Sequence, residues 1–221
     1  MKSVVCELKK VFTIVTLILF TSTNNPVLGS ATGLIVIPTA DTLPVGEYVV
    51  EPGINGPTDD GGENNYLLGT EFGILDNLEA GVDYDFSRGV ERRILLNTKY
   101  VFGLSPKYNL QGGIGIDNIS AGIRAKPYVV LTWRPSGHFG THAGIFDIVE
   151  DGRWFCGVDY SPLARLTIMA DYTSGVENIS SFGFFYQLTS RFGIQAGILI
   201  PKSKLDPTYS LLISFSGKYA K

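Results

Sequence analysis

Few residues of this chain could support catalysis or hold a metal ion, and its two histidines are the first to consider. His138 and His142 lie four residues apart, which separates them by ~13 Å along one face of a β-strand, too far to share a metal ion. Acyl transfer would need a histidine beside a nucleophile and a carboxylate, and Ser136 falls on a predicted tight turn. We therefore expect no catalytic residue, no metal site and no cofactor, and we interpret the histidines as polar lining.

Acidic residues form the second candidate group. Asp83 and Asp85 share a strand face at a separation of ~7 Å, within the range found in glycoside hydrolases, but this spacing arises wherever two acids occupy one face. Such a lining, with charges of both signs, would either pair internally and block a pore or line a modestly cation-preferring channel. No ladder of arginines for acidic sugars is present. The charged residues predicted to line the lumen are Glu79, Asp83, Asp85, Lys99, Lys126, Arg134, Asp159, Arg165 and Asp171.

These charged residues belong to segments in which apolar and polar residues alternate with a period of two, the period of a β-strand. In residues 78–86 every even position is apolar and every odd position is acidic or glycine. The same alternation predicts twelve strands, at residues 46–54, 64–74, 78–87, 92–102, 108–117, 123–134, 138–147, 152–161, 164–173, 179–188, 191–200 and 208–216.

The connections between these strands alternate between tight turns and longer polar loops. Most of the strands have close to the ten residues that a tilted strand needs to cross a membrane. Alternating short turns and long loops are typical of outer-membrane barrels. We therefore predict an all-β, transmembrane, antiparallel up-and-down barrel over residues 46–221, with both termini on the periplasmic, short-turn side.

A soluble barrel with an apolar interior is the alternative, and three observations favour the membrane barrel. Twelve strands enclose more space than side chains can fill, so an apolar lumen would be a large dry cavity. The predicted signal peptide exports the chain, as an outer-membrane barrel requires. Aromatic residues of the apolar face gather at the tight-turn ends, where a membrane interface is expected: Phe72, Phe102, Tyr108, Trp133, Phe139, Tyr160, Tyr186 and Phe192.

The first thirty residues have the basic, apolar and small-residue order of a cleaved secretory signal peptide. Lys2, Lys9 and Lys10 precede an uncharged run at residues 11–20, which is shorter than the ~20 residues of a membrane-spanning helix. Export of a β-barrel predicts a location in the bacterial outer membrane, with membrane lipid and lipopolysaccharide as its surroundings.

Composition excludes several other classes of protein. The formal net charge of −3 argues against a nucleic-acid partner. Two cysteines exclude a disulfide scaffold, and a hydrophobic content of 44 % is sufficient to bury a core, which excludes a disordered chain.

Residues 33–46, GLIVIPTADTLPVG, break the strand pattern because they are apolar, short and interrupted by Pro38 and Pro44. We expect an N-terminal segment, residues 31–45, to tuck into the lumen or to cover its periplasmic mouth. Residues 33–46, together with residues 72–84, FGILDNLEAGVDY, resemble the YjbH-like group of exopolysaccharide-associated outer-membrane proteins. The resemblance implies a barrel linked to polysaccharide export, with polysaccharide-secretion components as partners, and carries over no catalytic residue.

Three functional hypotheses follow from the sequence. The first is a small porin-like passive channel or a structural component of the Gram-negative envelope. The second is a non-conducting accessory protein for exopolysaccharide secretion, which conductance measurements would separate from the first. The third is a lipid-modifying barrel enzyme, which rests on the two histidines alone.

Overall fold

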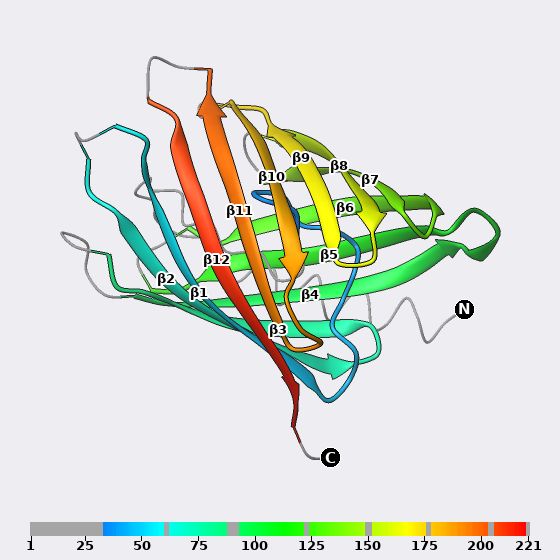
Figure 1. The fold of residues 1–221 in the computed structure, drawn as a ribbon. Coiled ribbons are helices and arrows are strands. Elements are labelled where there is room, and N and C mark those ends of the chain that lie inside the picture. The colour runs from blue at the N-terminus through cyan, green and yellow to red at the C-terminus, as the bar shows by residue number, and fades with distance from the viewer. Residues whose placement is uncertain are drawn as a thin grey trace.

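The computed structural model describes residues 33–59, 62–87, 93–121, 124–148, 152–175, 178–202 and 206–219, and the predicted signal peptide, residues 1–30, lies outside them. Strands β1 to β12 form one closed antiparallel barrel in which each strand pairs with its neighbours in sequence and β1 pairs with β12 (Figure 1). The predicted fold class is confirmed. The strands are β1 Glu47–Pro57, β2 Asn65–Leu75, β3 Leu78–Asp85, β4 Arg93–Ser105, β5 Leu110–Ile119, β6 Lys126–Ser136, β7 Phe139–Phe146, β8 Arg153–Leu163, β9 Leu166–Thr173, β10 Ile179–Gln187, β11 Phe192–Pro201 and β12 Thr208–Lys218.

The alternation of the sequence becomes an outward apolar face and an inward face that carries most of the charge. In β4, Ile94 and Leu96 are exposed on the outside, whereas Asn97 and Lys99 are buried on the inside. Successive strand residues point to opposite faces, and this pattern recurs around the barrel. Large apolar side chains therefore cover the outer wall, among them Leu68, Leu131, Ile145, Trp154, Phe182 and Ile200.

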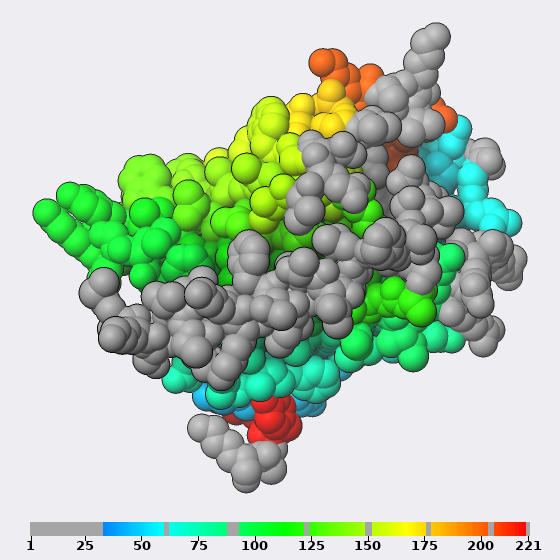
Figure 2. Space-filling model, turned by 180° about the vertical axis from the view of Figure 1, so that it is seen from behind, coloured from blue at the N-terminus to red at the C-terminus, as the bar shows by residue number. Residues whose placement is uncertain are grey.

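Short turns lie at one end of the barrel, where β1 begins and β12 ends. Glu47 of β1 pairs with Lys218 of β12, beside the two-residue turn between β2 and β3. The β4–β5 hairpin contains the 3₁₀ helix η1, Pro106–Tyr108, and Asn109 follows it with a φ of 49°. This hairpin projects beyond the neighbouring turns (Figures 1 and 2).

Within the described ranges, no helix has the length and hydropathy needed to cross a membrane. Residues 33–41 lie inside the barrel, where the segment drawn in blue passes between β9 and β10 on one side and β5 and β6 on the other (Figure 1). The hydrophobic core of the protein is built around this segment.

Candidate functional site in the lumen

Residues 33–46, named here the inner segment, occupy part of the lumen. The segment folds back on itself: Gly33 and Pro38 form an antiparallel bridge, and the Leu34 N–H donates to the Ile37 carbonyl at 2.9 Å. Ile37 is fully buried, and Ile35 is buried beside it. An apolar hairpin of this kind can remain in a barrel only if the wall offers it both apolar contacts and polar partners for its backbone.

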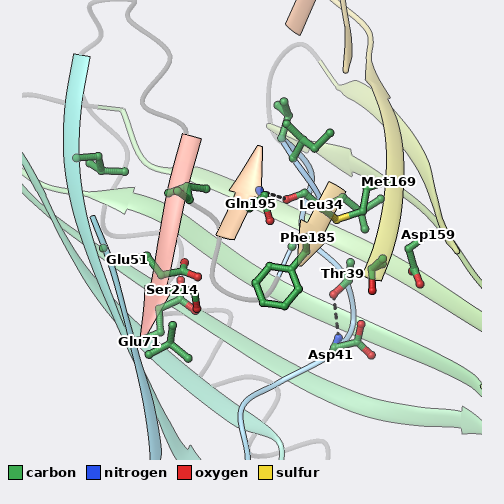
Figure 3. Close-up of a pocket in the computed structure, with 18 of the residues that line it drawn as sticks. Leu34, Thr39, Asp41, Glu51, Glu71, Asp159, Met169, Phe185, Gln195 and Ser214 are labelled. Atoms are coloured by element: carbon green, nitrogen blue, oxygen red, sulfur yellow. Dashed lines mark hydrogen bonds between the residues drawn. The ribbon is translucent and has the colours of Figure 1, made fainter. Parts of the chain in front are cut away.

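Asp171 of β9 provides the first polar anchor. Its Oδ2 accepts the backbone N–H groups of Ile35 and Val36 at 2.8 and 3.1 Å, and Ser181 of β10 donates to its Oδ1. On the other side of the turn, the Gln195 amide of β11 donates to the Leu34 carbonyl at 3.4 Å (Figure 3). One carboxylate thereby satisfies two consecutive backbone donors that would otherwise be buried without partners.

A second anchor starts at Thr132 of β6. Its hydroxyl accepts the Ala40 N–H at 2.8 Å and lies 2.9 Å from Nδ1 of His142, and the Nε2 of His142 lies 2.6 Å from the Asp159 carboxylate. The His142 ring therefore bridges the Thr132 hydroxyl and the Asp159 carboxylate, and Nε2–H donates to Asp159 because an ionised carboxylate can only accept.

Arg134 returns this network to the inner segment. Its guanidinium donates to Asp159 of β8 at 3.1 and 3.2 Å and makes a two-pronged contact with Asp41 at 2.7 and 3.3 Å. Burial raises the pKa of Asp41, but the hydrogen bonds and charge of Arg134 outweigh that effect and hold the pKa below its usual value. The ion pair therefore persists through the ordinary pH range.

The third anchor lies where the segment leaves the lumen. The Leu43 N–H donates to Glu79 Oε2 at 2.8 Å, and Glu79 pairs with Lys99 across β3 and β4 at 3.4 Å, with both side chains fully buried. The carbonyl of Pro44 lies where a Cβ atom of residue 73 would stand, so glycine is needed at that position of β2 for the segment to pass.

Thr132, His142 and Asp159 have the residue types and contacts of a nucleophile–base–acid set. The Thr132 side chain is fully buried, however, and its hydroxyl accepts a hydrogen bond from the Ala40 N–H. A nucleophile must be reachable by substrate, so the set acts as an anchor for the segment. His138 lies in the β6–β7 turn, exposed, with its Nδ1 3.1 Å from the Ser161 carbonyl.

The wall around the segment is apolar, contrary to the expectation of a polar lumen throughout. The inward side chains that pack with the segment are Val101, Tyr128, Val130, Phe155, Met169 and Leu199. Sequence reasoning missed this cluster because it assumed that an apolar lumen would be empty. The available signal was residues 128–131, where both faces of β6 are apolar and the alternation is lost.

A cavity of about 440 Å³ stays open beside the segment (Figure 3). Its lining combines apolar side chains of the segment and the wall, such as Ile35, Met169 and Phe185, with acidic side chains from three strands. Glu51 of β1, Glu71 of β2 and Asp83 of β3 all face this space, and Arg134 is the one lysine or arginine among the described residues that line it. The open part of the lumen is therefore acidic.

The residues predicted to line the lumen fall into three groups. Asp83, Arg134 and Asp159 line the cavity. Five others point inward from the strands but lie outside the cavity lining, and Asp85 among them accepts hydrogen bonds from Ser87 at 2.7 and 3.0 Å. These five, all buried except the half-buried Lys126, are Glu79, Asp85, Lys99, Lys126 and Asp171. His142, interpreted from the sequence as polar lining, also points inward and is buried, whereas His138 is exposed in a turn.

Arg165 is the correction to that prediction, because it lies exposed in the two-residue turn between β8 and β9. Strand β9 begins at Leu166, one residue after Arg165, so the Arg165 side chain is not held on the inward face of the strand. Glu51 and Glu71 were missed because the prediction considered inward charges only from strand β3 onward, although both alternate with outward residues of β1 and β2.

The eight aromatic residues predicted to form a girdle lie near the short-turn end. Six of them are exposed on the outer surface, whereas Phe72 and Phe139 are half-buried. Phe72 packs edge-on against Tyr219, and Phe192 against Phe215. Rings of β2 and β11 therefore contact rings in or directly after β12, which places aromatic groups near the end of that strand.

Solved structures with a similar fold are porins and related outer-membrane proteins. A KdgM porin in complex with disordered oligogalacturonate matches with a TM-score of 0.60 and 8 % identity, over 76 % of this chain and 98 % of that chain. A NanC porin matches with a TM-score of 0.57 and 15 % identity, over 76 % of this chain and 98 % of that chain. Omp33 of Acinetobacter baumannii matches with a TM-score of 0.52 and 9 % identity, over 78 % of this chain and 98 % of that chain.

The likeness shows the fold. No family model matches the chain, and no curated protein matches its sequence, so the resemblance to the YjbH-like group stays an expectation. Among the described residues, no group of three or more histidine, cysteine, aspartate or glutamate side chains is placed to hold a metal ion. A closed barrel of the porin type with an apolar outer wall belongs in the bacterial outer membrane.

Proposed function

We propose that this chain is a narrow, porin-like passive channel whose lumen is divided between its own inner segment and an open, acidic passage. The observation that carries the proposal is the cavity of about 440 Å³ that the closed barrel retains beside the segment. A barrel with a purely structural role would gain stability by filling that space with apolar side chains, whereas this one places carboxylates there.

The acidic lining favours small cations over anions. The positive charge of Arg134 is balanced by its ion pairs with Asp41 and Asp159. The electrostatic potential of the open passage is therefore set by Glu51, Glu71 and Asp83. Rings and clusters of carboxylates attract cations and repel anions at close range. The KdgM neighbour is described in complex with oligogalacturonate, a polyanion, and the lining of this chain opposes such a ligand.

Conductance of the refolded chain in a planar bilayer, with a salt gradient to measure ion preference, tests the proposal. We expect stable steps with a cation preference that falls several-fold in the triple variant Glu51→Gln, Glu71→Gln, Asp83→Asn. Asp85→Asn is the matched control, because Asp85 projects inward from β3, as Asp83 does, but lies outside the cavity lining. A folded barrel that shows no steps would refute the channel.

A non-conducting accessory role in exopolysaccharide secretion is the second candidate. It is favoured by the position of the inner segment, which already fills part of the lumen, and by the resemblance to the YjbH-like group. This candidate predicts no conductance together with loss of secreted polysaccharide when the chain is deleted from its host. A conducting barrel whose deletion leaves secretion unchanged would exclude it.

A further inference from the structure

The barrel closes without help from the inner segment. All twelve strands are joined in one continuous ladder, with nine residue pairs between β1 and β12. In the part of the chain that the structure describes, no backbone-to-backbone hydrogen bond joins residues 33–41 to a strand. The contacts that Leu34, Ile35, Val36 and Ala40 make with the wall through their backbone all go to wall side chains, so at these residues the segment lies against the wall and is not part of its hydrogen-bond ladder.

The wall is shaped to receive the side chains of the segment. A Cβ atom on Gly157 of β8 would lie 2.6 and 2.7 Å from the ends of Leu34 and Ile37, and one on Gly197 of β11 would lie 3.2 Å from two carbons of Ile35. These glycines face inward, and their missing side chains are the sockets that the apolar residues of the segment enter. A lumen wall needs no such sockets unless something is to lie against it.

Polar groups of the same wall recognise the backbone and one charge of the segment. Asp171 accepts the consecutive N–H groups of Ile35 and Val36, Thr132 accepts the N–H group of Ala40, and Arg134 pairs with the carboxylate of Asp41. Fixed acceptors for backbone donors, pockets for apolar side chains and one ion pair are the components of a peptide-binding groove.

We propose that the lumen wall formed by β6 and β8–β11 is a peptide-binding site, and that residues 33–41 are its tethered ligand, which can leave and be replaced. The ligand class is a short hairpin peptide with apolar residues in its turn and an acidic residue at its C-terminal end. That the bound peptide blocks ion flow depends on the proposed channel function, whereas the binding of the peptide to the wall does not.

The experiment uses the full chain with a site-specific protease sequence inserted after Pro44, an exposed residue of the link to β1. The folded barrel is cleaved and washed, and mass spectrometry measures the segment retained. A dye-labelled peptide of residues 33–41 is then added, and its binding is measured by fluorescence anisotropy and its effect by conductance. A peptide with Ile35→Asp is the control ligand.

Two barrel variants locate the site. Gly197→Val fills the Ile35 socket, whereas Gly103→Val adds a side chain to an exposed position of β4 that has no neighbour within 4 Å. A second route needs no cleavage: in the full chain with Ile35→Asp, the native segment seats poorly and the labelled peptide replaces it directly.

Saturable binding that is at least tenfold weaker for the Ile35→Asp peptide, and weaker in Gly197→Val but not in Gly103→Val, would support the site. Larger conductance steps after washing, reversed by the peptide, would support the blocking role. The proposal would be overturned if the cleaved segment remained bound at one copy per barrel and the labelled peptide replaced neither it nor the Ile35→Asp segment of the full chain. The segment would then be a permanent part of the hydrophobic core. Selective exchange in a barrel that never conducts would retain the peptide site and refute the channel.

Discussion

Arg134 of β6 joins Asp41 of the inner segment to Asp159 of β8, two strands along the wall, with nitrogen–oxygen distances of 2.7 and 3.1 Å. Asp159 also accepts from His142, which contacts the Thr132 hydroxyl that receives Ala40. The chain of contacts therefore begins and ends on two adjacent residues of the segment. The Arg134 guanidinium therefore contacts Asp41 directly and is connected to Ala40 through Asp159, His142 and Thr132.

Arg134→Gln should loosen the segment, because it leaves two carboxylates near each other without their cation. We expect a loss of about 1–2 kcal/mol in the free energy of unfolding, after allowance for partial exposure of the pair. Urea denaturation in detergent followed by tryptophan fluorescence measures it. Arg134→Lys should give an intermediate loss, since an ammonium cannot contact both carboxylates in a planar fork; equal stability of all three proteins would contradict this role.

The pH dependence of the Asp41 contact has a definite sign. Because Arg134 holds the pKa of Asp41 below its usual value, the ion pair stabilises the seated segment fully above that usual value and is lost as the pH falls through the lower, folded pKa. Proteolysis of the link to β1 should be unchanged between pH 7 and pH 5 and should accelerate below about pH 4. Asp41→Asn should remove the acid step and show faster cleavage already at pH 7.

Gly157→Ala tests whether the sockets are specific. The added Cβ would enter the space of Leu34 and Ile37, and overpacking of this kind costs about 1–3 kcal/mol. Gly103→Ala is the control, because the same methyl group there meets no neighbouring atom. Equal unfolding midpoints for the two variants would show that the segment yields without cost.

The outer wall should respond to charge according to its depth in the membrane. Leu131 lies outward near the middle of β6, and Leu163 lies exposed at the last residue of β8 beside a short turn. Leu131→Arg should destabilise the barrel in lipid by about 2–4 kcal/mol, and Leu163→Arg by about 0–1 kcal/mol. Comparison of unfolding in lipid vesicles measures the difference, and equal losses would place the apolar belt elsewhere.

The sequence predicted the barrel well because alternation is a local property of each strand. The twelve predicted segments correspond to β1–β12, with ends displaced by a few residues, and the inward position of Asp83, Lys99 and Asp171 follows from the period of two alone. Strand β9 begins at Leu166, later than predicted, so Arg165 lies in the turn before it and not in the lumen.

The inner segment illustrates what alternation cannot predict. The contact between Ile35 and Asp171 spans 136 residues, and no local pattern encodes which wall an apolar hairpin will meet. In the sequence, the sockets are visible only as glycines at inward positions of β8 and β11, Gly157 and Gly197, and a polar lumen would not require glycine there. Together with the apolar inward residues of β6, these glycines indicate that another part of the protein packs against this wall.

The position of the inner segment also constrains the order of assembly. Residues 33–41 precede every strand, yet their partners lie on β6, β8, β9 and β11, so the seat does not exist until most of the wall has formed. The segment must therefore be enclosed as β1 approaches β12, or it must enter afterwards through the short-turn end. The earliest stretch of the described chain is consequently among the last to reach its native contacts.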